Sequence, residues 1–126
     1  MRSVLVDTSV WVAHFRQHND QLAQLLVGDQ VMGHPLIVGE IACGTPPDRV
    51  RTLADLGCLQ PVRQASLQET MAFVERENLF GLGCGLVDFL LLASVMMTPG
   101  VALWTLDKRL CALAGRFGVV HPLGAH

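Results

Sequence analysis

Hydrophobic residues along the chain gather in short continuous runs, and these runs predict the strands of the fold. The first run, Ser3 to Val6, is apolar and partly β-branched, and it ends at Asp7. The third run, residues 59–62, contains Pro61, and a proline restricts a strand to an edge or an end of a sheet. The predicted strands cover residues 3–6, 30–33, 59–62, 101–106 and, as a possible fifth strand, 118–121.

Between these runs, the spacing of apolar positions and the capping residues predict helices. Thr8 or Ser9 can begin the first helix, and Ser66 with Glu69 is a capping-box pattern that opens another. The expected helices cover residues 9–15, 20–27, 36–43, 46–56, 67–78, 86–97 and 107–117. Three glycines between residues 81 and 85 indicate a flexible loop before the most apolar of these helices.

Strands that alternate with helices, and that are apolar throughout, are typical of a parallel sheet covered on both faces. We therefore expect an α/β fold with three layers, α/β/α, around a central parallel sheet of four or five strands. At 126 residues the chain has room for one core, so we expect one domain spanning residues 1–126.

Composition raises the question of a membrane span, because 51% of residues are hydrophobic and the mean hydropathy is +0.41. The one candidate, Leu79 to Met97, contains three glycines and Asp88, and an aspartate at mid-span costs about 2.5–3.5 kcal/mol. Nor does the N-terminus resemble a signal peptide. We expect a cytoplasmic protein outside the membrane. Its four widely spaced cysteines are then expected to be buried free thiols.

Four of the eleven acidic residues stand alone in apolar sequence, whereas the other seven lie in mixed polar stretches. The four are Asp7, Glu40, Asp88 and Asp107. Burying an unpaired carboxylate costs on the order of several kcal/mol. No basic residue lies close in sequence to Asp7, Glu40 or Asp88 and could pair with them. A shared divalent cation, Mg²⁺ or Mn²⁺, would explain all four placements.

The predicted topology can bring these acids together. Asp7 and Asp107 follow two predicted strands, and open α/β sheets place their ligand crevice at the carboxyl ends of the strands. Glu40 and Asp88 are expected in the first halves of helices that begin at that edge. Simpler alternatives stay open: Asp7 or Asp107 can cap the helix that follows it, and Glu40 can pair with Arg49 or Arg51.

Four segments of the sequence resemble the acidic motifs of PIN-domain nucleases. They are Val4-Leu5-Val6-Asp7-Thr8-Ser9-Val10-Trp11, Pro35-Leu36-Ile37-Val38-Gly39-Glu40, Gly85-Leu86-Val87-Asp88-Phe89-Leu90-Leu91-Leu92-Ala93 and Trp104-Thr105-Leu106-Asp107-Lys108-Arg109-Leu110. They occur in the family's order and span nearly the whole chain. The chain's size and N-terminal start are most similar to the VapC toxins of bacterial toxin–antitoxin pairs.

This resemblance implies a PIN-like fold and a cytoplasmic endoribonuclease that uses Mg²⁺ or Mn²⁺. It also implies a homodimer, inhibited by a small antitoxin that places an arm in the active site. The four acids map onto the family's metal-binding positions, and Thr8 or Ser9 and Thr105 map onto supporting polar positions. Many relatives carry a further acid where this chain has Arg109, which leaves open one metal ion or two.

Arg109 can then pair with the acids or hold a substrate phosphate. The net charge of −2 is unusual for a protein that binds RNA, so we expect a local basic groove. Its candidate cations are Arg16, Arg49, Arg51, Lys108, Arg109 and Arg116. The histidines are expected mostly at the solvated surface, with His34 near the cleft.

Two other functions compete with the ribonuclease. A phosphoryl-transfer domain could use Asp7 as its nucleophile, although haloacid-dehalogenase-like enzymes usually have a second acid where this chain has Ser9. A non-catalytic module of the same fold could serve only to bind a partner, but such a module has no need of four acids.

Overall fold

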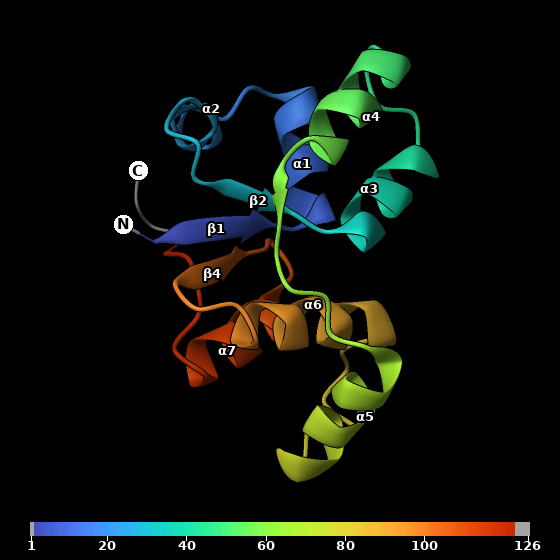
Figure 1. Ribbon diagram of the computed structural model, residues 1–126, viewed down its shortest axis with the longest axis vertical. Helices are drawn as coiled ribbons and strands as arrows, with labels where there is room; N and C mark the ends of the chain where they lie inside the picture. Colours follow the sequence, from blue (N-terminus) through green and yellow to red (C-terminus); the bar gives the residue numbers. More distant parts are fainter. Residues whose placement is uncertain (1, 123–126) are drawn as a thin grey trace.

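A four-stranded parallel sheet runs through the middle of the computed structural model, which describes residues 2–122. Its strands lie in the order β3-β2-β1-β4 (Figure 1). They are β1 Ser3–Val6, β2 Val31–Gly33, β3 Gln60–Pro61 and β4 Val101–Trp104. The possible fifth strand is reduced to one parallel bridge between Leu103 and Val120. The expected parallel sheet is therefore confirmed, with the proline-containing strand at an edge.

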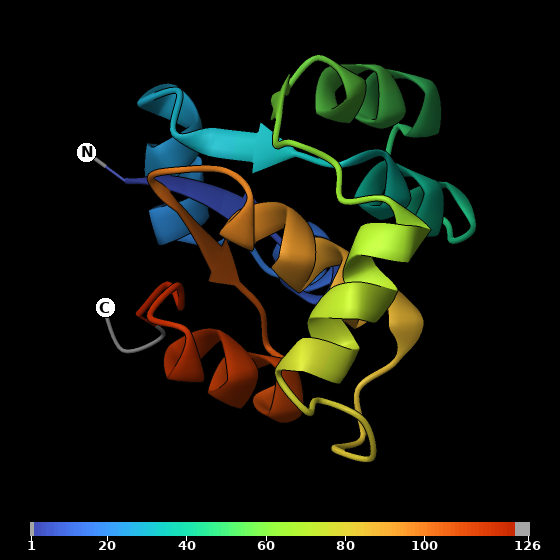
Figure 2. The ribbon, with the colours of Figure 1, turned by 60° about the horizontal axis from the view of Figure 1, so that its bottom comes forward.

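Seven helices in the described part of the chain cover this sheet on both faces. They are α1 Thr8–Arg16, α2 Asp20–Val27, α3 Pro35–Ala42, α4 Arg49–Gly57, α5 Leu67–Arg76, α6 Leu86–Met96 and α7 Lys108–Arg116. Figure 1 shows α1 to α4 on one side of the strands and α5 to α7 on the other. In Figure 2, α6 lies in front of α1. The expected three-layer α/β/α fold is confirmed.

The order of the strands explains this arrangement. From β1 the chain moves outward to β2 and then to β3, and it returns to the other side of β1 only with β4. Because parallel crossovers are right-handed, reversing the direction of travel moves the helices to the opposite face. The reversal also creates a switch point between β1 and β4, and ligands bind at the carboxyl ends of strands on either side of such a point.

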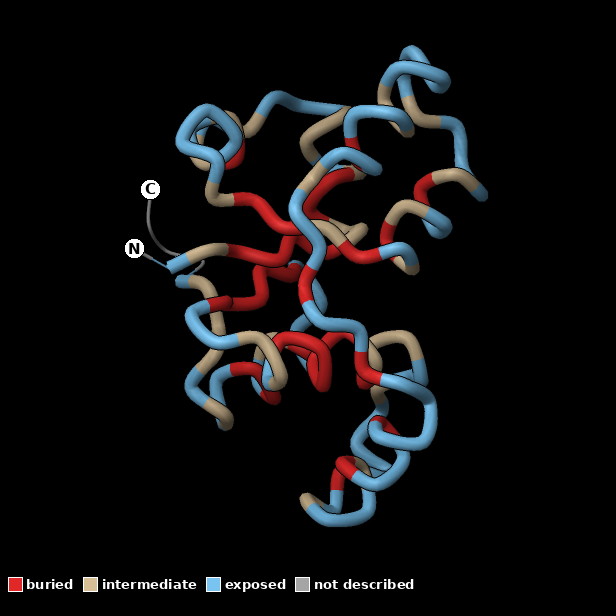
Figure 3. The backbone as a smooth tube through the Cα atoms, viewed as in Figure 1, coloured by how far each residue is buried: buried red, intermediate tan, exposed pale blue. Residues whose placement is uncertain are grey.

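The core is built around the strands β1 and β4 and the helix α6. Every residue of β4 is buried, and Figure 3 shows the strands as the most buried part of the molecule. Along α6, six of the seven residues from Phe89 to Val95 are buried, which explains why this stretch is so apolar. In residues 2–122, no helix combines the length and the apolar character that crossing a membrane requires.

Two local expectations are confirmed and two are wrong. Ser66 and Glu69 form the expected capping box, with Ser66 Oγ accepting from Glu69 N at 3.0 Å. Helix α4 begins at Arg49 and not at the prolines, because Asp48 has a left-handed backbone with φ of 48°. The cysteines are free as expected, but Cys43 and Cys58 are exposed and the other two are only partly buried.

Candidate active site

Asp7 is the one buried member of the four acids, with 8% of its surface exposed. It lies just after β1, where its N–H donates to the carbonyl of Trp104 at 2.9 Å and extends the pairing with β4. Its backbone begins α1, but its side chain makes no capping bond. The side-chain oxygen Oδ2 instead accepts the hydroxyls of Ser9 and Thr105, both at 2.8 Å. The capping alternative for this residue is therefore wrong.

The same two hydroxyls connect Asp7 to the segment that leads into α7. Thr105 Oγ1 accepts from the N–H of Asp107 at 3.1 Å, and Ser9 Oγ accepts from the N–H of Leu106 at 3.1 Å. Each hydroxyl thus donates to a carboxylate and accepts from a backbone amide. This pair of bridges fixes the carboxyl ends of β1 and β4 relative to each other.

Asp107 itself caps α7, with Oδ1 accepting from the N–H of Leu110 at 2.9 Å. The capping alternative is therefore correct for this residue, and its carboxylate is exposed. A cap of this kind occupies one oxygen, so Oδ2 keeps its lone pairs for another partner.

Glu40 lies in the second half of α3 and is exposed, so the expectation of a place in the first half was wrong. Its Oε1 accepts the hydroxyl of Thr8 at 2.7 Å, which connects α3 to the residue after Asp7. The proposed pairing with Arg49 or Arg51 is absent from the described structure. Arg49 donates to the carbonyls of Ala42 and Gly44, and Arg51 approaches Asp55.

Asp88 lies in the first turn of α6, as expected, and is half-buried. Its Oδ2 accepts the N–H of Gly85 at 3.1 Å. Burial raises the pKa of Asp88 above its usual range, and the charges of Asp107 and Asp7 raise it further, against the opposing effect of the Gly85 N–H. The charges of Asp7 and Asp107 therefore lie close enough to disfavour the ionisation of Asp88.

Within residues 2–122, none of the four acids forms an ion pair. Equally, no three His, Cys, Asp or Glu side chains in this part of the chain are already arranged around one point that could hold a metal ion. The structure thus presents an uncompensated group of carboxylates at the switch point. Chemically, such a group suits a hard divalent cation, which would bring the oxygens together as it binds.

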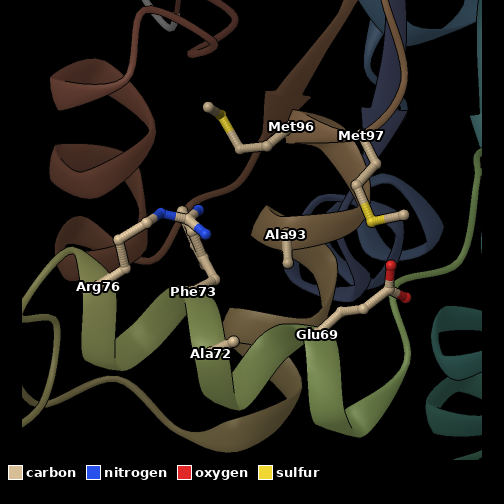
Figure 4. Close-up of a pocket in the computed structure, with 7 residues that line it drawn as sticks. All are labelled: Glu69, Ala72, Phe73, Arg76, Ala93, Met96 and Met97. Carbon is tan, nitrogen blue, oxygen red and sulfur yellow. The ribbon is translucent and has the colours of Figure 1, made fainter.

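A pocket elsewhere lacks this chemistry. It lies between α5 and α6 and has a volume of about 400 Å³ (Figure 4). Its two charged side chains, Glu69 and Arg76, come from α5 and already have partners in Ser66 and Glu77. A pocket of this volume therefore does not by itself identify the active site.

No protein-family model matches the sequence. Ribonuclease VapC32 of Mycobacterium tuberculosis strain CDC 1551 / Oshkosh is 40% identical over 116 residues, which cover 92% of this chain and 94% of that protein. The protein of the same name from strain ATCC 25618 / H37Rv matches to the same extent. This chain belongs to the VapC-type PIN-domain ribonuclease toxins. The resemblance seen in the four acidic motifs is confirmed, and the phosphoryl-transfer and non-catalytic alternatives lose their basis.

Sequence reasoning missed two glycines of this VapC-type site. Gly85 supplies the N–H that holds Asp88, and Gly83 lies against Arg109, whose Nη1 donates to its carbonyl at 3.3 Å. The glycine-rich loop was recognised only as flexible. Its three closely spaced glycines were the available signal, because a glycine at positive φ, such as Gly83 at 88°, often allows a close approach.

The histidines also differ from expectation. His34 is 5% exposed and lies inside the fold, not at the cleft. Its Nδ1 accepts from the N–H of Leu36 at 3.1 Å and caps α3, so the ring proton lies on Nε2, which is 3.3 Å from Ser94 Oγ. Burial lowers the pKa of His34 below its usual range. The neutral ring is therefore the form that the fold requires.

We expect the protein to lose stability as pH falls below about 6.5, the unfolded pKa of histidine. Because the folded-state pKa of His34 is lowered, the unfolded chain binds the proton at a higher pH than the folded protein does. The loss of stability therefore continues until the pH falls below the folded-state pKa of His34. One proton gives a slope of at most about 1.4 kcal/mol per pH unit. Thermal unfolding between pH 7.5 and 5 measures this slope. Replacing His34 with Asn, which can still cap α3, should reduce the slope. An equal slope in that variant would contradict the assignment, and the exposed His18→Gln is the control.

Proposed function

We propose that this VapC-type toxin is an endoribonuclease whose activity depends on Mg²⁺ or Mn²⁺ and whose cation is held by Asp7, Glu40, Asp88 and Asp107. The observation that carries the proposal is the group of unpaired carboxylates at the β1–β4 switch point, in a chain of this family. Of the eleven acidic residues, the four proposed ligands are the two that follow the neighbouring strands β1 and β4 and the two that lie on α3 and α6.

The residues of this site divide the work between them. Asp7 is fixed by two hydroxyl bonds, so it would define the centre of the site, while Thr8 would orient Glu40. An acid of the group that does not bind the cation directly would accept the proton of the attacking water. When bound, the cation lowers the pKa of a coordinated water and neutralises charge on the phosphate. Whether one ion or two act here stays a prediction to be tested.

Removal of divalent cations tests the central claim. RNA cleavage by the purified protein should fall to background in EDTA and return when excess Mn²⁺ or Mg²⁺ is added, because the carboxylates alone repel the phosphate. A catalytically silent preparation must be shown to be folded by circular dichroism. Cleavage that continues undiminished in EDTA would show that the acids act without a cation, and the proposal would fail.

We propose that the RNA strand extends from the four acids along a groove of about 460 Å³ beside α1 and α3. Glu40 lies in the wall of this groove, as do Arg16, the partly buried Phe15 and the loop of residues 44–47. A cation next to a partly exposed aromatic ring suits a phosphate and a base of single-stranded RNA. This groove takes the place of the broad basic surface that the net charge of −2 makes improbable.

We expect Arg16→Ala to raise KM for RNA about tenfold and to leave kcat within about twofold, the effect of one lost charged hydrogen bond away from the reacting atoms. The slope of log KM against log salt should also become shallower by about 0.7, the value for one phosphate on a single strand. Arg76→Ala, on the distant helix α5, is the matched control. Equal values of KM in the two variants would remove the groove from the proposal.

A homodimer and a cognate antitoxin are also proposed, on the strength of the family. Large apolar side chains exposed on the described surface support a protein partner, among them Met71 at 51%, Phe80 at 59% and Met96 at 42%. Light scattering would test the dimer: a mass near 13.7 kDa at micromolar concentration would exclude it. Co-expression with the neighbouring small reading frame would test the antitoxin. The cytoplasmic location stays a prediction.

A further inference from the structure

Two of the candidate cation ligands, Asp88 and Asp107, belong to different helices. Asp88 lies in the first turn of α6, whereas Asp107 precedes α7 and caps it. They are separated in sequence by the rest of α6, a turn and the whole of β4. Both are carboxylates, and like charges repel each other. Something must therefore keep the first turns of these two helices at a fixed separation when no cation is bound.

Arg109 connects the first turn of α7 to the loop that leads into α6. It is the second residue of α7, two positions after Asp107. Its Nη1 donates to the carbonyl of Gly83 at 3.3 Å, and Gly83 precedes by two positions the Gly85 whose N–H holds Asp88. Among the described residues, Arg109 makes no ion pair with any of the acids.

The contact is close enough that a side chain at position 83 would displace the guanidinium. A Cβ at position 83 would lie 2.7 Å from Nη1 of Arg109 and 2.9 Å from its Cδ and its Cζ. Gly83 also has φ of 88°, a left-handed conformation that a residue with a side chain adopts only with strain. The guanidinium therefore lies directly on the loop backbone. In the sequence, the two residues are 26 positions apart, so the contact joins separate parts of the chain.

We propose that Arg109 is a positioning residue, a strut from α7 to the loop of residues 81–85 that sets the separation of Asp88 and Asp107 and so prepares the site for its cation. The proposal rests on the proposed function of these two acids as cation ligands. It differs from both roles that the sequence left open for Arg109, since the guanidinium neither pairs with a carboxylate nor has to contact substrate.

The direction in which the affinity for Mn²⁺ changes when Arg109 is replaced distinguishes a strut from a simple nearby charge. A positive charge beside a cation site opposes cation binding, so removing a charge alone should tighten the binding of Mn²⁺. Removing a strut should weaken it, because the two acids would have to be brought back into register as the ion binds. The same substitution thus has opposite effects under the two explanations.

The test is Mn²⁺ titration of the full chain by calorimetry, with Arg109→Ala, Gly83→Ala and Lys108→Ala. We expect Arg109→Ala to weaken binding about five- to tenfold, and Gly83→Ala, which displaces the guanidinium, to do the same. Lys108→Ala removes an equal charge one position away, with no side-chain hydrogen bond in the described structure, and should bind within twofold of the unaltered protein or more tightly.

A second measurement reports on the loop without any metal. Chymotrypsin can cut after Phe80 or Leu82, which are exposed at 59% and 45%. Cleavage there should be faster in Arg109→Ala and Gly83→Ala than in Lys108→Ala, with unchanged circular dichroism in all three. Mn²⁺ binding in Arg109→Ala as tight as in the unaltered protein, or tighter, would overturn the strut, as would an equally resistant loop. If the unaltered protein itself failed to bind Mn²⁺, the proposed cation site would fail and the strut with it.

Discussion

Asp7→Asn is expected to reduce RNA cleavage by on the order of 10³-fold or more while the protein stays folded. The substitution removes the buried negative charge at the centre of the proposed site, and it keeps the size of the side chain. The asparagine oxygen can still accept the hydroxyls of Ser9 and Thr105. Loss of activity would therefore come from the missing charge and not from disorder of the strand ends.

The same change should leave the melting temperature unchanged or slightly higher. Asp7 is held close to the charges of Asp88 and Asp107, and neutralising one member of such a group relieves repulsion. Cleavage is measured in single-turnover assays with Mn²⁺, alongside thermal unfolding. Asp29→Asn is the matched control, since Asp29 is exposed in the turn before β2 with φ of 56°, a conformation that asparagine tolerates. Activity within tenfold of the unaltered protein would exclude Asp7 from the site.

The second large effect concerns stability. Leu103→Ala should lower the free energy of unfolding by about 2–5 kcal/mol, out of a total of about 5–15 kcal/mol for a domain of this size. Leu103 is fully buried in β4, opposite Leu5 of β1, and the other face of its strand is covered as well. The cavity left by alanine would have little freedom to collapse.

Urea unfolding measures this change through the midpoint at constant slope. Val27→Ala serves as the control, because Val27 is 89% exposed and its truncation should cost less than about 0.5 kcal/mol. A loss below about 1 kcal/mol in Leu103→Ala would mean that β4 is packed far more loosely than the structure indicates.

The fold was predictable because its strands are short, apolar throughout and separated by clear helix signals. The exposure of Glu40 was not. Apolar residues surround it in sequence, but in α3 only Ile37 and Ile41 are buried, four positions apart on one face. Glu40 lies at the border of this face, beside Ile41, where its carboxylate is exposed. Apolar neighbours in a sequence thus indicate an apolar environment for strands, whereas in a helix they must first be sorted by face.

The contacts that hold the site could not be predicted from local sequence patterns either. Thr105 reaches Asp7 across 98 positions, and Arg109 reaches Gly83 across 26. Both contacts depend on which strands become neighbours and on the path of a glycine-rich loop. The sequence indicated that the acids would meet at the carboxyl edge of the sheet, and β1 and β4 are indeed paired there. It did not indicate which hydroxyls and amides would hold each carboxylate.

The pairing of β1 with β4 has a consequence for the order in which each molecule is synthesised and folds. The first of these strands begins at Ser3 and the second ends at Trp104, so every residue between them must be synthesised before the two can meet. Contacts between such distant segments form late, because a long loop has to close first. A nascent or half-folded chain therefore holds Asp7 without Thr105 and Asp107. Under the proposed function, a ribosome that makes this toxin is not exposed to its activity until β4 and the residues that follow it have been made.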